Sequence, residues 1–355
     1  MTFPGKYLPN VTVDGATLIT GVLNQSGPAV CVSIGTKVYV LNTAIGVFLT
    51  GGSAPVGVYW VDAGTGQMLG AVTWGNATGV ASTSISNGGL DMVASGTDLY
   101  ITTIDFPAGT GKLIKFNTLT EQFTDLDTLA EYSLITANAG NLYLIKSSSN
   151  TLERRTIAAP TVVVDSTAVP TAAFAIAIDT VTTNYGDGLA RVWAGPNRYP
   201  LTGFNGGSPE GTPFTPSANI GSIGVGSSSL YFATTGSLID RVDPDAQTIS
   251  ATYDMAPDFD ALKDIRYDSI NSKFMLLGSS TGTRWVGRIS LVGAIESTID
   301  IPLSSGDFFF LVKATVNSSK FFFTRVIDGN LYSTATTGAL VMSAGLPVVV
   351  GWSNP

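Results

Sequence analysis

Short apolar runs separated by turn residues dominate the chain. Seven times, a turn of Gly, Ser or Asn is followed within a few residues by an aromatic side chain inside a run of β-prone residues. The seven aromatic residues are Tyr39, Tyr100, Tyr143, Trp193, Tyr231, Phe274 and Phe321. The first and the last are 282 residues apart, so the unit recurs on average about every 47 residues. The pattern predicts a β unit repeated along the whole chain.

A second pattern follows some of these aromatics: an apolar strand, a polar turn that begins with Asp or Asn, and another strand, as a hairpin requires. The match is good in three copies, Val58–Met68, Leu113–Phe123 and Ile239–Ile249. Each period therefore predicts an inner strand, the aromatic strand and an outer hairpin, which make a four-stranded antiparallel sheet. The second period shows all four strands, at residues 90–94, 99–104, 113–117 and 121–124.

Several predicted strands are apolar throughout instead of alternating. Examples are Leu230–Phe232, Phe308–Val312 and Phe321–Phe323. A strand that is apolar at every position has both sheet faces covered, whereas a two-sheet sandwich would leave one face polar. Sheets stacked side by side satisfy this requirement.

Together these patterns predict an all-β fold: a seven-bladed β-propeller of four-stranded antiparallel blades, forming one domain over residues 1–355. Repeats of roughly 40 to 50 residues are typical of such blades. The blades are expected near residues 22–79, 80–127, 128–167, 168–217, 218–256, 257–303 and 304–355, with residues 1–21 helping closure. The N- and C-terminal strands, Val11–Ile19 and Leu346–Trp352, are expected to close the ring and so remove exposed sheet edges.

The hairpin pattern resembles the YVTN and NHL type of propeller repeat, in which an aromatic strand is followed by a strand, a turn with Asp or Asn, a Thr and another strand. This loose resemblance covers nearly the whole chain. It implies the fold and not the function, because such propellers include binding, scaffolding and catalytic proteins.

The composition of the chain limits the fold class and the kinds of partner that it can bind. Charged residues make up only 12% of the 355 residues and Gly numbers 40, which favours strands and tight turns over helices. A net charge of −8 argues against a nucleic-acid partner, since phosphate binding needs clustered Lys and Arg. No apolar run reaches the roughly 18 to 20 residues that span a bilayer, so no membrane insertion is expected. Met1–Asn10 lacks a basic segment followed by an apolar one, so no secretory signal is expected.

The sequence offers little for catalysis. It has no histidine, which removes the commonest general base and zinc ligand, and its one cysteine, Cys31, is interpreted as a small buried apolar residue. Asp254, Asp258, Asp260 and Asp264 could form a calcium or glycosidase site, but no Gly bends this stretch and a solvated loop is the preferred interpretation. We expect no catalytic residues, no metal site and no cofactor.

Two segments are longer than a blade requires: Thr43–Val56 and Ala194–Pro216. Long loops on a rigid scaffold often carry binding sites, and aromatic residues there can anchor an interface. The second segment is the candidate interaction loop, although it could equally be a structural cover for blade four. Its candidate anchors are Trp193, Tyr199, Phe204 and Phe214.

Three functions are weighed. The first is a structural or attachment protein of a tailed-bacteriophage particle, located in the virion, part of an oligomeric assembly and in contact with other virion proteins or a host surface component. It rests on a composition rich in Gly, Ser, Thr, Ala and Val that resembles phage tail and fibre proteins. The second is a bacterial surface or extracytoplasmic propeller that binds a carbohydrate or a partner protein. The third is a carboxylate-based hydrolase, such as a glycosidase or a lactonase-like propeller.

Overall fold

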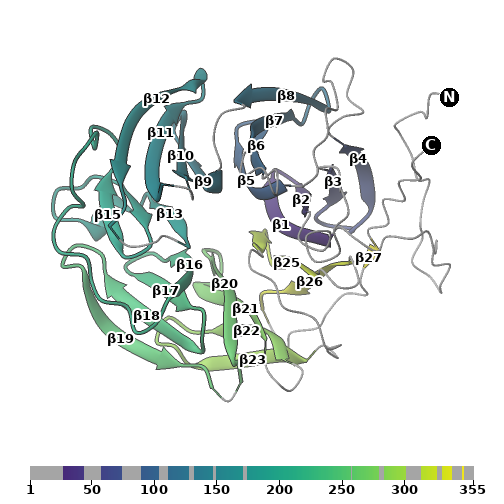
Figure 1. The fold of residues 1–355 in the computed structure, drawn as a ribbon. Coiled ribbons are helices and arrows are strands. Elements are labelled where there is room, and N and C mark those ends of the chain that lie inside the picture. Colours follow the sequence, from purple (N-terminus) through teal and green to yellow (C-terminus); the bar gives the residue numbers. More distant parts are fainter. Residues whose placement is uncertain are drawn as a thin grey trace, which may run out of the picture. The chain divides into compact units, whose positions relative to one another are not determined.

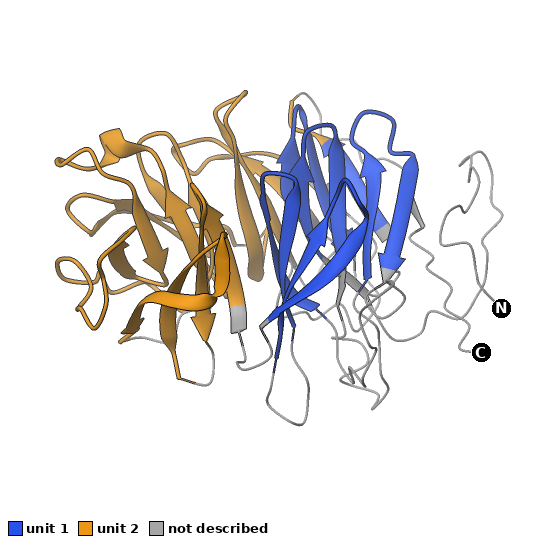
Figure 2. Cartoon of the chain, turned by 90° about the horizontal axis from the view of Figure 1, so that it is seen from above, with its two compact units in different colours: residues 1–131, 305–334, 342–355 blue, residues 132–304, 335–341 orange. Residues whose placement is uncertain are grey.

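The chain consists of two compact units, residues 1–131, 305–334 and 342–355 in one and residues 132–304 and 335–341 in the other (Figure 2). The computed structural model describes residues 27–43, 57–73, 89–103, 111–127, 132–146, 149–170, 174–256, 258–279, 284–300, 313–325, 330–337 and 346–347. The segments Met1–Asn10 and Val11–Ile19, and the predicted long segment after Thr43, lie outside the described residues.

The first unit contains blades one, two and seven. Blade one consists of β1 (Gly27–Ile34), β2 (Lys37–Thr43), β3 (Gly57–Asp62) and β4 (Met68–Thr73). Blade two consists of β5 (Gly89–Ser95), β6 (Asp98–Thr103), β7 (Leu113–Asn117) and β8 (Gln122–Asp127). Blade seven consists of β24 (Thr315–Asn317), β25 (Lys320–Arg325), β26 (Asn330–Ala335) and β27 (Leu346–Pro347). One parallel pair, Thr43 with Gly89, joins the sheets of blades one and two.

The second unit contains blades three to six, whose strands lie side by side in chain order (Figure 1). Blade three has β9 (Tyr132–Asn138), β10 (Asn141–Lys146), β11 (Thr151–Thr156) and β12 (Ala159–Ala168). Blade four has β13 (Ile176–Asp179), the 3-10 turn η1 (Thr182–Asn184), β14 (Arg191–Ala194) and β15 (Asn197–Pro200). Blade five has β16 (Ile220–Val225), β17 (Leu230–Thr234), β18 (Leu238–Asp243) and β19 (Thr248–Asp254). Blade six has β20 (Ala261–Asp268), β21 (Lys273–Ser279), β22 (Arg284–Ile289) and β23 (Ile295–Asp300).

The predicted fold class is confirmed: the chain is an all-β, seven-bladed propeller of antiparallel blades. Blade four departs from the expected four strands, because β13–β14–β15 are the strands described in its sheet. The C-terminal residues Leu346–Pro347 pair with β26 inside blade seven, as expected for the last strand. The strands of the blades fall inside the predicted ranges, except that β12 runs one residue past the predicted end of blade three, to Ala168. That the whole chain behaves as one domain stays a prediction.

All seven repeat aromatics occupy the second strand of their blades and are at most 2% exposed. The strands that carry them are buried on both faces, as the continuous apolar runs predict. In β2, Tyr39 and Leu41 belong to the core shared with blade two, whereas Val38 and Val40 face a core shared with blade seven. Cys31 lies in that second core, so its interpretation as a buried apolar residue is confirmed.

The outer hairpins of blades one, two and five share one turn geometry. Asp62 Oδ1 accepts hydrogen bonds from the Thr65 backbone N–H (2.7 Å) and hydroxyl (3.0 Å). Asn117 Oδ1 accepts from the Thr120 backbone N–H (2.8 Å) and hydroxyl (3.1 Å). Asp243 Oδ1 accepts from two backbone N–H groups of its own turn. A side chain that bonds the backbone two or three residues on fixes such a turn, which explains why Asp or Asn recurs there.

A one-residue bulge recurs near the start of the first strand in blades one, two, three, five and six. The extra residues, which have no partner in the strand register, are Ala29, Leu90, Ser133, Gly221 and Lys263. Bulges bend a strand and turn the following side chain. In blades five and six this brings two polar groups together, because the Ser222 hydroxyl donates to Asp264 Oδ1 at 2.6 Å.

Candidate functional site

The four predicted interface anchors lie in the interior. Trp193 and Tyr199 are fully buried on β14 and β15, and Phe204 and Phe214 are 3% and 7% exposed. Phe204 packs on Tyr199, with ring centroids 6.0 Å apart, and Phe214 packs on Trp193 at 6.4 Å. These side chains form the core of blade four and offer no exposed aromatic surface. That the segment binds a partner stays a prediction.

Residues 201–216, here called the strap, follow β15 and are bonded to the neighbouring blades. Toward blade three, the Gly206 N–H donates to the Ser166 carbonyl (2.8 Å) and Tyr143 OH donates to the Leu201 carbonyl (2.8 Å). Toward blade five, Gln247 Nε2 donates to the Glu210 carbonyl (2.7 Å). The strap therefore covers blade four and connects blades three and five.

An ion cluster holds the strap against blade four. Glu210 Oε2 lies 2.5 Å from Arg191 Nε and 3.2 Å from Arg198 Nε, and Arg191 also pairs with Asp187. Both guanidinium groups lie over the ring of Tyr185, at 5.2 and 5.6 Å from its centroid. Hydrogen bonds from the Leu189 N–H and from Arg191 lower the pKa of Asp187, so this carboxyl stays ionised well into the acid range.

Beneath this cluster, Tyr185 is held by a buried hydrogen-bond chain. Trp193 Nε1–H donates to Tyr185 OH (2.9 Å), which donates to Asp179 Oδ2 (3.0 Å), and Asn184 Nδ2 donates to the same oxygen (2.8 Å). Burial raises the pKa of Tyr185 far above its usual range. The phenol thus remains a neutral donor, and these hydrogen bonds fix the loop that carries η1.

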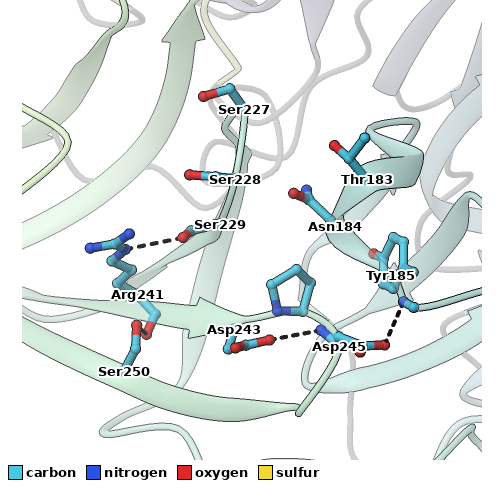
Figure 3. A pocket seen from close by; sticks show the side chains of 12 residues that line it. Thr183, Asn184, Tyr185, Ser227, Ser228, Ser229, Arg241, Asp243, Asp245 and Ser250 are labelled. Carbon is cyan, nitrogen blue, oxygen red and sulfur yellow. Dashed lines mark hydrogen bonds between the residues drawn. The ribbon is translucent and has the colours of Figure 1, made fainter. Parts of the chain in front are cut away.

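A polar pocket of about 610 Å³ lies in the second unit, between the loop of blade four just described and the turns of blade five (Figure 3). Its lining is dominated by hydroxyl, amide and charged groups: Thr183, Asn184, Tyr185, Gly186, Ser227, Ser228, Ser229, Arg241, Asp243, Pro244, Asp245 and Ser250. Its size falls within the roughly 300 to 1,000 Å³ of small-ligand sites.

Arg241 is the basic residue of this lining. Its Nε donates to the hydroxyl of the buried Ser229 (3.1 Å), which fixes one edge of the guanidinium. A bulge at Ser250, opposite Arg241 in β19, places a hydroxyl that donates to the Arg241 carbonyl (3.1 Å). Among the described residues, the terminal nitrogens Nη1 and Nη2 have no hydrogen-bond or ion-pair partner.

Asp243 and Asp245 line the pocket, and each uses one carboxylate oxygen to bond a backbone N–H group. Asp243 Oδ1 accepts from the N–H of Asp245 (3.0 Å), and Asp245 Oδ1 accepts from the N–H of Gly186 (3.2 Å). Arg198 Nη1 donates to the Pro244 and Asp245 carbonyls at 2.5 and 3.1 Å, so blade four holds this turn in place. Within the described part of the chain, the Oδ2 atom of each carboxylate accepts no hydrogen bond.

The acidic stretch does not form one site. Asp264 is buried and bonds Ser222 and Arg266, so the solvated-loop interpretation is wrong for this residue. Asp254 instead accepts from the Ser237 hydroxyl and the Ala256 N–H. No group of three or more Cys, Asp or Glu side chains in the described ranges is arranged to hold a metal ion. In the same ranges, no helix is both long and apolar enough to cross a membrane.

No protein-family model matches the sequence, and no curated protein matches it either. Solved structures do resemble it. KlHsv2 with loop 6CD replaced by a Gly-Ser linker is 8% identical with a TM-score of 0.59, over 91% of this chain and 100% of that one. The WD40 propeller domain of Doa1 is 10% identical with a TM-score of 0.60, over 86% and 92%. A chain of the mitotic checkpoint complex is 11% identical with a TM-score of 0.54, over 73% and 77%.

Fold and comparisons together define the class of protein: a seven-bladed β-propeller that resembles WD40 structures. At these identities the likeness concerns the fold alone. The sequence alone does not predict the pocket residues, Arg241 above all. Its signals for them are the run Ser227–Ser229 and an arginine in the middle of a β-prone strand. Neither signal specifies a site, because the pocket forms only where the loop of blade four faces these residues.

Proposed function

We propose that the chain is a non-enzymatic binding module that holds a partner through the polar pocket of its second unit. The observation that carries this proposal is Arg241, a fixed guanidinium with two unpaired nitrogens at the wall of the pocket. An arginine in that state is prepared to bind a ligand without rearrangement, which lowers the entropic cost of association.

A binding role agrees with the chemistry of the site. The sequence has no histidine, and within the described residues no Ser or Thr hydroxyl of the pocket is hydrogen-bonded to a carboxylate. One of the similar structures belongs to a protein assembly, the mitotic checkpoint complex, and this favours a macromolecular partner for the present chain as well. The strap adds a second surface, whose polar outer side would lie next to a bound partner.

The setting we propose is the particle of a tailed bacteriophage, with the pocket directed to another virion protein or to a host surface component. Its support is the composition, low in charge and rich in Gly, Ser, Thr, Ala and Val. The alternative setting is a bacterial surface. Mass spectrometry of purified virions distinguishes the two, because the virion role requires peptides of this chain in the particle.

The binding role is tested on an array that carries both peptides and glycans, with the wild type and the variant Arg241→Gln. We expect the wild type to retain at least one class of ligand and the variant to lose it. Lys115→Gln is the matched control, because it removes one positive charge on blade two, outside the pocket. Circular dichroism and thermal unfolding report whether each variant is folded.

Two results would contradict the proposal. One is equal retention by the wild type and a folded Arg241→Gln variant, which would place binding elsewhere. The other is chemical conversion of the retained ligand, seen by mass spectrometry after prolonged incubation, which would make the protein an enzyme.

A further inference from the structure

We infer that the pocket binds a singly charged sugar acid, a polyhydroxyl ring that carries one carboxylate. The inference rests on the proposed binding function and names the ligand class for the same site. It draws on three groups of the pocket: the guanidinium of Arg241, the two Asp carboxylates, and the hydroxyls of Thr183, Ser227 and Ser228 (Figure 3).

The first group selects a carboxylate. A guanidinium offers parallel N–H groups that match the two oxygens of a carboxylate in a bidentate pair. In Arg241 the Nε edge is occupied by Ser229, which leaves the Nη1 and Nη2 edge for the ligand. The partner of Arg241 is therefore expected to be planar and anionic, and to come from outside the chain.

The second group excludes a strong anion and requires donors. Asp243 and Asp245 line the same pocket, so with Arg241 its charged lining sums to one negative charge. A phosphate group, which carries nearly two charges at neutral pH, would be repelled more strongly than a carboxylate. The Oδ2 atoms of both exposed carboxylates accept no hydrogen bond from the described residues, so ring hydroxyls of a ligand can donate to them without adding charge.

The third group matches the remaining ring. Thr183, Ser227 and Ser228 are exposed hydroxyl residues on the two opposite sides of the pocket. Hydroxyls both donate and accept, and so suit a ligand whose own groups are hydroxyls. An apolar ligand would leave this lining without hydrogen-bond partners, and each hydroxyl desolvated in that way would weaken binding.

The test is saturation-transfer NMR and calorimetry with the full chain and three probes: D-glucuronate, D-glucose and glucose 6-phosphate. We expect glucuronate to bind at least tenfold more tightly than either of the others. Because these ligands are compared on the wild type, the result does not depend on whether a variant folds. Arg241→Lys keeps the charge but loses the planar fork, and we expect it to weaken glucuronate binding about tenfold, whereas Lys115→Gln leaves it unchanged.

Equal binding of glucose and glucuronate would overturn the role of the carboxylate, and tighter binding of the phosphate would overturn the charge argument. Binding of none of the probes, with a peptide retained on the array through Arg241, would overturn the sugar acid and leave the binding function standing. Loss of all ligands on both assays would overturn both proposals. Glucuronate bound tightly and equally by the wild type and Arg241→Lys would place the acid at another site.

Discussion

Blade two and blade four each bury an aromatic residue on the second strand, Tyr100 in one and Trp193 in the other, but their outer halves differ. Blade two ends in a regular hairpin whose turn is fixed by Asn117. Blade four replaces that hairpin with the strap, which is held by buried aromatics, ion pairs and bonds to two neighbouring blades. Local turn chemistry completes a regular blade, whereas the irregular blade relies on long-range contacts and borders the pocket.

The largest loss of stability is expected from the inner half of the blade, which is built in the same way in blades two and four. Trp193→Ala leaves a large cavity beside Phe232, 5.6 Å away, and removes the donor to Tyr185 OH, so it should lower the free energy of unfolding by about 3 to 5 kcal/mol. Tyr100→Ala in blade two should cost a similar amount. Urea denaturation measures both, and a cost below about 1 kcal/mol for Trp193→Ala would mean that blade four is not packed around this residue.

The strap gives the next effect. Phe214→Ala should cost about 3 kcal/mol, because the ring is buried against Trp193 and lies 4.8 Å from Phe232. The matched substitution in blade two is Leu119→Ala, which changes a turn residue that is 76% exposed and should alter stability by less than about 0.5 kcal/mol. Equal, small effects in denaturation would show that the strap is an ordinary surface loop.

Removing an ion pair should change stability less than removing a buried ring, and should still cost more in blade four than in blade two. Glu210→Gln leaves Arg191 and Arg198 close together with one carboxylate fewer, and should cost about 1 to 3 kcal/mol. Asp125→Asn breaks the exposed pair with Lys112 in blade two, at 2.9 Å, and should cost at most about 1 kcal/mol. The comparison is made by denaturation at low and high salt, and a larger loss in blade two would reverse it.

The smallest effect concerns the regular turns. Hydrogen bonds from the Thr65 N–H and hydroxyl lower the pKa of Asp62 below its usual 3.8. A carboxyl whose pKa is depressed by folding adds stability above its unfolded pKa and loses it as the pH falls through the folded pKa. Asp62→Asn should therefore be slightly less stable than the wild type at pH 7, and this small difference should disappear as the pH falls below about 4. Parallel loss in both proteins would assign the acid sensitivity elsewhere.

The contrast also shows what the sequence could predict. The seven aromatics, the continuous burial of their strands and the Asx turns were predictable because each depends on residues within a few positions of one another. The strap and the pocket depend on contacts between residues 37 to 59 positions apart, such as Gln247 with Glu210 and Gly186 with Asp245. Aromatics in a long loop look the same in sequence whether they face solvent or, like Phe214, a blade core.

The strap also limits how the propeller could be rebuilt. A blade that is closed by its own hairpin can be duplicated or exchanged as a unit, because all the residues that complete it lie within its own segment of the sequence. Excising blade four would carry the strap away and leave Ser166 in blade three and Gln247 in blade five without the groups they now bond. In chimeras of this propeller, the junctions should therefore lie outside blades three to five, and these three blades should be taken together from one parent.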